Sequence, residues 1–171
     1  MGRSIVKDLV EINDRRTLED FLRTTPLDEI SQAFHWALQS QKDNMVSAML
    51  PFVVRNQNTA PMLLLGVPTT YFQWNLYHTM QYNNHSAFDF MLEHIELHND
   101  WKNALLVACC MENQCCIKKL YKGADPGATH EYFESKNYEH LFEKHIVPLL
   151  QNEVLQQATQ LMGANKSARK L

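Results

Sequence analysis

Apolar and polar residues follow one nine-position pattern in four separate places along the chain. An apolar residue comes first, small or apolar residues follow three and four positions later, polar residues stand at seven and eight, and mostly apolar residues at eleven, twelve, fifteen and sixteen. The copies begin at Val6, Phe34, Leu76 and Leu105. Apolar residues spaced three and four apart form one face of an amphipathic helix, and the polar pair interrupts that face. Each copy therefore predicts two helices joined by a tight polar turn.

Turn and capping signals set the bounds of these four helical hairpins. They are expected near residues 4–25, 26–54, 70–99 and 100–126. Thr25 and Pro26 predict the start of one helix, and Asn99 with Asp100 predicts the cap of another. The copies begin at unequal intervals, and the longest interval contains an insertion at residues 54–70 rich in Asn, Pro, Gly and Thr. A short extra helix at Met62–Leu65 is one interpretation of the apolar run inside that insertion.

The last third of the chain does not follow the pattern. Gly123 and Pro126 predict the end of the fourth hairpin, and one helical segment is expected from His130 to Val147. Pro148 begins or kinks a last helix, which Gly163 ends. The apolar residues of that helix lie on one face: Leu149, Leu150, Val154, Leu155, Ala158, Leu161 and Met162. We therefore expect a single repeat domain over 1–163, with an irregular helical cap at 127–163 and a flexible basic tail at 164–171.

Composition favours a folded helical protein. The chain has 171 residues, 45% of them hydrophobic, with only 5 glycines and 6 prolines. With a net charge of -3, the chain lacks the excess of basic residues that is typical of a general nucleic-acid binder. No apolar run reaches the ~20 residues of a membrane span, and the first residues lack the apolar core of a secretion signal. The expectation is an all-α protein with reduced cysteines in the cytoplasm.

A repeated helical pair cannot bury its apolar face alone. It stacks on its neighbours and forms an elongated solenoid with an exposed binding face. This architecture favours a recognition protein over an enzyme.

The copy that begins at Leu105 resembles an ankyrin repeat. Ala104–Ala108 corresponds to the start of the first helix, Cys116–Leu120 to the second, and Gly123–Pro126 to the loop that opens the family's next hairpin. In the second copy His35 falls on the histidine of the family's TPLH motif, which implies a scaffold role. No copy has the full motif or a glycine at the turn between helices. The resemblance covers about Val6 to Pro126 and implies an ankyrin-like stack.

An ankyrin-like stack implies a concave surface lined by slots two, five and six of each first helix. Those slots carry Trp, Tyr, His and Met and no charge, which is typical of recognition surfaces. The insertion or the C-terminal helices could instead cover them, and both interpretations stay open. The predicted partner-binding residues are Trp36, Gln39, His78, Gln81, Tyr82, Cys110 and Met111, with Ser40 and Val107 in the remaining slots.

Candidate chemistry is sparse in the sequence. The adjacent pairs Cys109–Cys110 and Cys115–Cys116 lack zinc-ligand spacing, and the register places Cys109 and Cys116 in the core. In residues 94–98 (HIELH) the glutamate is displaced from its place in the zinc-protease motif. A basic strip at Lys118, Lys119 and Lys122 is explained by a solvated helix face, with an acidic or phosphate contact as the alternative. No metal or cofactor is expected.

The sequence thus predicts a protein-interaction module without catalytic activity, acting as an adaptor or inhibitor of a partner protein. Degenerate repeats with a long insertion resemble those of viral, phage or bacterial-effector proteins, which implies a host factor as partner. The alternative is an all-helical enzyme that uses a Cys/His site, because such residues can be distant in sequence and close in space.

Overall fold

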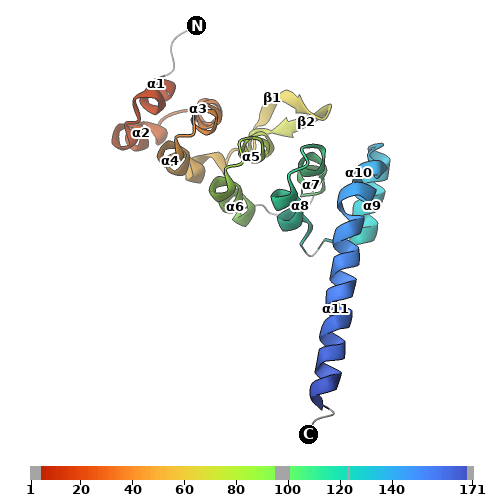
Figure 1. Ribbon diagram of the computed structural model, residues 1–171. Coiled ribbons are helices and arrows are strands. Elements are labelled where there is room, and N and C mark those ends of the chain that lie inside the picture. The colour runs from red at the N-terminus through yellow and green to blue at the C-terminus, as the bar shows by residue number, and fades with distance from the viewer. Residues whose placement is uncertain (1–4, 95–100, 123, 169–171) are drawn as a thin grey trace. The chain divides into compact units, whose positions relative to one another are not determined.

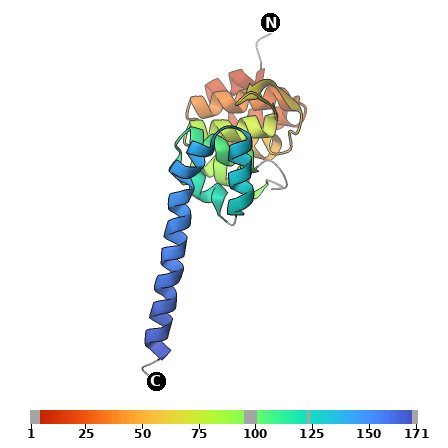
Figure 2. The ribbon, with the colours of Figure 1, turned by 90° about the vertical axis from the view of Figure 1, so that its right-hand side faces the viewer.

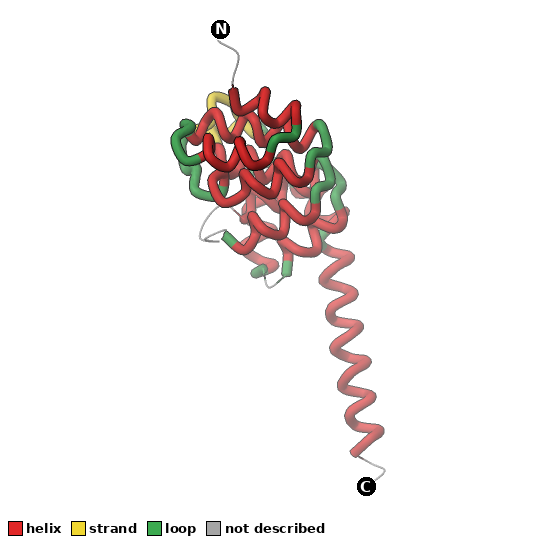
Figure 3. Tube along the Cα trace, turned by 90° about the vertical axis from the view of Figure 1, so that its left-hand side faces the viewer, coloured by secondary structure: helices red, strands yellow, loops and turns green. Residues whose placement is uncertain are grey.

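The computed structural model describes residues 5–94, 101–122 and 124–168, without the side chains at 62, 67 and 161–168. The described chain is mostly helical, and its strands are confined to one short hairpin (Figure 3). Two compact units divide the chain at residues 107 and 108, and each is treated by itself. The expected Asn99–Asp100 cap, most of the segment at 94–98 and Gly123 lie outside the described residues.

Three helical hairpins and a β-hairpin form most of the first unit, residues 1–107 (Figure 1). The helices are α1 (Ile5–Ile12), α2 (Arg15–Leu22), α3 (Leu27–Gln39), α4 (Asp43–Val53), α5 (Tyr71–Gln81) and α6 (His85–Glu93). Helix α1 packs against α3 and α3 against α5, while α2 packs against α4 and α4 against α6. The first helices of the hairpins therefore form one layer and the second helices form another.

The predicted apolar slots are the core of these layers. The fully buried side chains include Phe34, Leu76, Met80 and Phe88. Phe21, which occupies an apolar slot of the first hairpin, is instead exposed on α2. The slot pattern is thus confirmed as a burial pattern for most of its positions, because the residues it aligns face the neighbouring hairpin.

One turn geometry joins the two helices of every hairpin. The residue at slot seven has a positive φ, and its N–H donates to the carbonyl of slot four. The N–H of slot eight donates to the carbonyl of slot three. These two bonds are the Schellman arrangement that satisfies the last carbonyls of a helix. The slot-seven residues are Asn13, Gln41, Asn83, Glu112 and Asn137, with φ from 54° to 62°.

In four of the five turns, the side chain of the slot-eight residue bonds to the backbone of the second helix or of the previous hairpin. Asp14, Asn84 and Asn113 accept a bond from the backbone N–H three residues later. The ammonium of Lys42 instead donates hydrogen bonds to the carbonyls of Val10 and Glu11 at the end of α1. A cation at a helix C-terminus opposes the negative end of the helix dipole, so Lys42 links the first hairpin to the second.

The insertion is a β-hairpin and not the short helix suggested for Met62–Leu65. Strand β1 (Thr59–Leu64) pairs antiparallel with β2 (Val67–Thr70), and Leu64 lies opposite Val67. Leu65 and Gly66 form the two-residue turn, both with positive φ. A two-residue turn with positive φ at both positions matches the right-handed twist of the paired strands. The same residues in a helical turn would not allow the two strands to pair.

A buried polar network holds the base of this β-hairpin. The amides of Asn56 and Asn75 both donate to the hydroxyl of Ser31 on α3. The backbone N–H of Phe72 donates to the carbonyl of Asn56, and Thr70 caps α5 in a capping box with Gln73. The hairpin therefore leaves α4 and enters α5 along a fixed path.

The second unit, residues 108–171, contains a fifth hairpin that the sequence pattern did not identify. Helix α7 (Trp101–Cys110) crosses the boundary between the units and is followed by α8 (Gln114–Tyr121). The single helix expected over His130–Val147 is two, α9 (Pro126–Ser135) and α10 (Glu139–His145), joined by the Asn137 turn. His130 and His145 occupy apolar slots of this copy, which concealed it.

Helix α11 (Val147–Ala168) is longer than expected. Pro148 stands in its first turn as predicted, but Gly163 does not end it. A glycine inside a helix costs only about 1 kcal/mol relative to alanine, and the neighbouring residues Leu161, Met162 and Ala164 are good helix formers.

Candidate partner-binding surface

Aromatic and histidine side chains line one face of α5. Trp74, Tyr77, His78, Gln81 and Tyr82 follow the i, i+3, i+4, i+7, i+8 spacing of a single helix face. The aromatic rings among them are in contact. Trp74 stacks on Tyr77 with centroids 5.6 Å apart, and it meets the ring of His78 edge-on with centroids 4.4 Å apart. We call these five residues, together with His35 of α3, the aromatic–histidine stripe.

His78 lies at the centre of the stripe and beneath its surface. Its ring stacks on His35 with centroids 3.7 Å apart, and its Nδ1 is 2.9 Å from Oε1 of Gln81. The side chain is only 3% exposed. Burial, together with the neighbouring His35, lowers the pKa of His78 to about 4. His78 is therefore neutral at pH 7 and supports the surface from below, which corrects its assignment as a contact residue.

His35 joins the stripe to α3. Its Nε2 is 3.2 Å from the hydroxyl of Tyr82, and burial lowers the pKa of His35 as well. The scaffold role expected for His35 is consistent with this position between two helices. Two neutral imidazoles can stack closely, whereas two charged ones would repel each other.

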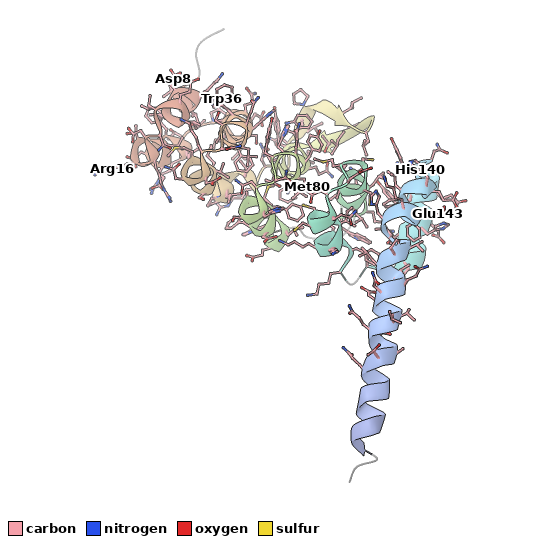
Figure 4. All side chains as sticks on the ribbon, viewed as in Figure 1. Asp8, Arg16, Trp36, Met80, His140 and Glu143 are labelled. Carbon is pink, nitrogen blue, oxygen red and sulfur yellow. The ribbon has the colours of Figure 1, made fainter. Side chains whose placement is uncertain are left out.

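The other predicted contact residues differ in exposure. Gln39 and Gln81 are exposed, and Tyr82 is half-buried. Trp36 on α3, labelled in Figure 4, is also half-buried. The ammonium of Lys7 lies 4.1 Å from its ring centroid. Cys110 is exposed and Met111 half-buried, but both belong to the second unit.

Tyr82 also borders a groove of mixed polar and apolar lining in the first unit. The groove has a volume of about 480 Å³ and lies between the second and third hairpins, at their turns. Asp43 and Ser47 contribute from α4, and Asn84 and His85 from the start of α6. The amide of Asn84 donates to Asp43 across the two hairpins. Tyr82 is a predicted contact residue, whereas Asp43 and Ser47 were not singled out from the sequence.

The β-hairpin adds an apolar element beside the stripe. Leu63 is 62% exposed and Leu65 is 38% exposed. Leu64 points inward and lines a small apolar pocket with Tyr77, a member of the stripe. The leucines at the tip are thus adjacent to α5 in the first unit.

A gap in the charge pattern could have revealed this surface. No Asp, Glu, Lys or Arg lies between Arg55 and Asp89, although one residue in five is charged over the whole chain. This stretch contains the β-hairpin and all of α5. Charged residues are depleted at the centres of protein interfaces, and their absence from the exposed and half-buried positions of this stretch is typical of such an interface.

The cysteines occupy the places that the register predicts. Cys109 and Cys116 are buried, and Cys110 and Cys115 are exposed. Burial, with a smaller effect of Cys110, raises the pKa of the Cys109 thiol to about 12. A nucleophilic cysteine needs a lowered pKa, so Cys109 has the character of a core residue.

Clustered metal ligands and membrane-spanning helices are both missing from the described residues. No three His, Cys, Asp or Glu side chains converge there as a metal site requires. Within the same residues, no helix is both long enough and apolar enough to span a bilayer.

Comparison with known proteins finds nothing similar. No family model matches the chain, and neither a curated protein nor a solved structure is significantly similar to it.

Proposed function

We propose that this chain is a stack of ankyrin-like helical hairpins that binds a partner protein and has no catalytic activity of its own. The observation that carries the proposal is the uncharged stretch between Arg55 and Asp89, which includes the exposed leucines of the β-hairpin and the exposed or half-buried residues of the stripe on α5. An uncharged, aromatic, partly exposed surface is suited to desolvation against another protein.

The repeated turn supports an ankyrin-like architecture. Five hairpins use the same pair of backbone bonds and the same left-handed residue. In the first unit the first helices form one layer and the second helices another, with the β-hairpin projecting from the connection between α4 and α5. Repeats of this kind stack in register, and a solenoid follows from continuing that stack.

The partner is expected to present an apolar, uncharged surface. Gln39, Gln81 and Tyr82 supply adaptable polar contacts around the aromatic rings, and Leu63 and Leu65 supply apolar ones. Such a module acts by occupying or bridging a partner, as an adaptor or inhibitor does. A host factor in the cytoplasm is the partner suggested by analogy with degenerate repeats in pathogen proteins.

The test compares two charged variants with a matched control. A partner captured on immobilised protein is purified, and its Kd is measured by calorimetry for Gln39→Lys, Leu63→Lys and Gln160→Lys. The first two place a charge on the proposed surface at exposed positions, so folding is unaffected. Gln160→Lys makes the same change on exposed α11.

A charge buried against an apolar partner should weaken binding at least about tenfold for Gln39→Lys and Leu63→Lys, and leave Gln160→Lys unchanged. Circular dichroism melting curves should coincide for all three variants. Equal affinity of the three variants would show that the partner binds elsewhere on the chain.

A further inference from the structure

His145 fills a core position that other hairpins give to apolar side chains. It stands at slot fifteen of the fifth hairpin, counted from the Asn137 turn. The same slot carries Met49, Met91 and Leu120 in the second, third and fourth hairpins, and all three are buried. His145 is buried as well, and only 5% exposed. Three hairpins therefore place a side chain here that cannot titrate, and the fifth places one that can.

The ring of His145 is only partly hydrogen-bonded in this core position. Its Nδ1 lies 3.0 Å from the side-chain amide nitrogen of Gln114, the first residue of α8. Its Nε2 is buried and has no hydrogen-bond partner among the described residues. A protonated imidazole carries an N–H on both nitrogens, so protonation would place a charge and an unpaired donor in the core. The neutral ring is therefore the form that the packed hairpin accommodates.

A second contact joins the fourth and fifth hairpins beside His145. The ammonium of Lys144 donates a hydrogen bond to Oε1 of Glu112, in the turn before α8. This bond, and then the charge of Lys144, lowers the pKa of the Glu112 carboxyl below its usual 4.5. Glu112 therefore stays ionised in mildly acidic solution. Of the two contacts, only that of His145 changes its charge between pH 7.5 and 5.

The charges around His145 come from a small number of groups. Burial is the main cause that lowers the pKa of His145, the charge of Lys144 adds to it, and Glu112 opposes it. On α9, Nε2 of His130 is 3.5 Å from Glu139 of α10, so protonation of His130 would strengthen the contact between α9 and α10. Acid therefore acts in opposite directions on the two histidines of this hairpin's core slots.

Other charged side chains of the surrounding helices are exposed, where water screens them. They are Lys118 and Lys119 of α8, Glu131 and Glu134 of α9, and Glu153 of α11. On α10 itself, His140 and Glu143 lie on the exposed outer side (Figure 4).

Helix α10 holds the fifth hairpin in place. It packs against α9 and against α11, as two views at right angles show (Figures 1 and 2). Its last two residues, Lys144 and His145, make the contacts to the fourth hairpin described above. Helices as short as α9 and α10 are marginal in water without packing partners. Weakening the contact at the end of α10 therefore affects the whole hairpin.

We propose that His145 is an acid-sensitive latch between the fourth and fifth hairpins. Its neutral ring fills the core slot and bonds to Gln114, and its protonation releases the fifth hairpin so that water can hydrate the charged ring. The fourth hairpin keeps its fold when the latch opens. The latch is a property of the second unit alone and does not depend on a partner.

The direction of the effect follows from the two states of the ring. In the released hairpin the ring meets water and has the ordinary pKa of 6.5, whereas burial lowers the pKa of the packed ring. The latch is therefore at full strength above pH 6.5 and weakens as the pH falls toward the lowered pKa. At pH 5 a ring with a pKa of 6.5 raises the released population by at most about 30-fold over that at neutral pH.

Amide hydrogen exchange of the full chain at pH 7.5 and 5.0 tests the latch, with rates corrected for the direct effect of pH on exchange. We expect the protection of the α9 and α10 amides to fall by about 3-fold to 30-fold at pH 5.0, and that of α8 to fall less. His145→Met gives this slot the side chain of Met49 and Met91 and should remove the fall. His140→Gln removes an exposed histidine of α10 and should leave the fall unchanged.

A titration of the His145 ring by nuclear magnetic resonance gives a second measure that needs no substitution. The pKa of His145 should lie below 6.5 in the folded chain. Four results would overturn the latch. They are equal protection of α9 and α10 at the two pH values, a fall that His145→Met leaves unchanged, an equal fall in α8, and a His145 pKa of 6.5 or above. The third would mean that acid unfolds the second unit as a whole.

Discussion

Helix α5 and the middle of α11 both lie in stretches without charged residues, yet their surroundings differ. Seven of the eleven residues of α5 are buried, among them Asn75, His78 and Thr79. The middle of α11 exposes Val154 and Leu155 instead. An uncharged stretch thus indicates a surface that must be covered, and the chain itself covers most of α5. The same absence of charge therefore accompanies a helix that is mostly buried within the chain and a helix whose apolar side chains stay exposed.

The largest effect expected from this comparison comes from the same substitution in both helices. Leu76→Ala in α5 should reduce the free energy of unfolding by about 3 kcal/mol, because Leu76 is fully buried and its removal leaves a cavity. That corresponds to a fall in Tm of about 6–12 °C. Leu155→Ala in α11 should change the stability of the monomer by less than about 0.5 kcal/mol.

Thermal unfolding at low protein concentration, followed by circular dichroism, measures both variants. Equal losses for Leu76→Ala and Leu155→Ala would mean that α11 is covered within the monomer, and the contrast between the helices would disappear.

A second effect is specific to α5 and depends on pH. The pKa of His78 falls from 6.5 to about 4 on folding, so the unfolded chain binds the extra proton between these values. The neutral ring of His78 makes its full contribution to the free energy of unfolding above pH 6.5. That contribution is lost as the pH falls to about 4. Its upper limit is about 3 kcal/mol, at 1.36 kcal/mol per pKa unit.

Urea unfolding at pH 7.5 and 4.5 measures this loss, with His78→Leu as the control. The variant should lose less stability than the unmodified chain over the same interval, while His35 and His145, whose pKa values are also lowered, contribute in both proteins. Identical losses in the two proteins would remove His78 as the source.

The smallest effect concerns the tip of the β-hairpin. Leu65 has a φ of 51°, a conformation that asparagine adopts more readily than leucine. Leu65→Asn should therefore raise the stability of the isolated protein by about 0.5 kcal/mol, or Tm by about 1–2 °C. It should also weaken partner binding, since it removes an exposed apolar group.

Scanning calorimetry and the partner Kd together measure these opposite changes. A drop in Tm would show that Leu65 stabilises the hairpin itself, and would argue against its role as a contact.

Much of the fold follows from residue spacing alone. The slots at Phe34, Leu76 and Leu105 located the hairpins because helix periodicity and burial coincide there, and Cys109 and Cys116 fell in the core for the same reason. The β-hairpin was missed because four apolar residues at 62–65 fit a buried helix turn as well as a strand. The strand forms because these residues pair with residues 67–70. The periodicity of one segment gives no information about its pairing with another.

The fifth hairpin and the aromatic–histidine stripe show a second limit of prediction from residue spacing. His130, Glu134 and His145 stand in slots where apolar residues were expected, so the copy was hidden until the Asn137 turn was observed. In the candidate surface, Gln39, Gln81 and Tyr82 were placed in contact slots by register. The ring of His78 is buried because it stacks on His35 of α3. The repeat pattern of a single helix does not specify the distance between α3 and α5, so this burial could not be predicted from it.

The five matching turns also bear on how the chain acquires its structure. Each is closed by two backbone bonds that span three and five residues, and so requires almost no loop closure. The chain therefore has five equivalent places at which ordered structure can begin, in contrast to a sheet protein that depends on distant pairings. The β-hairpin, whose base is held through Asn56 and Asn75 by Ser31 of α3, would become ordered only after α3 and α5.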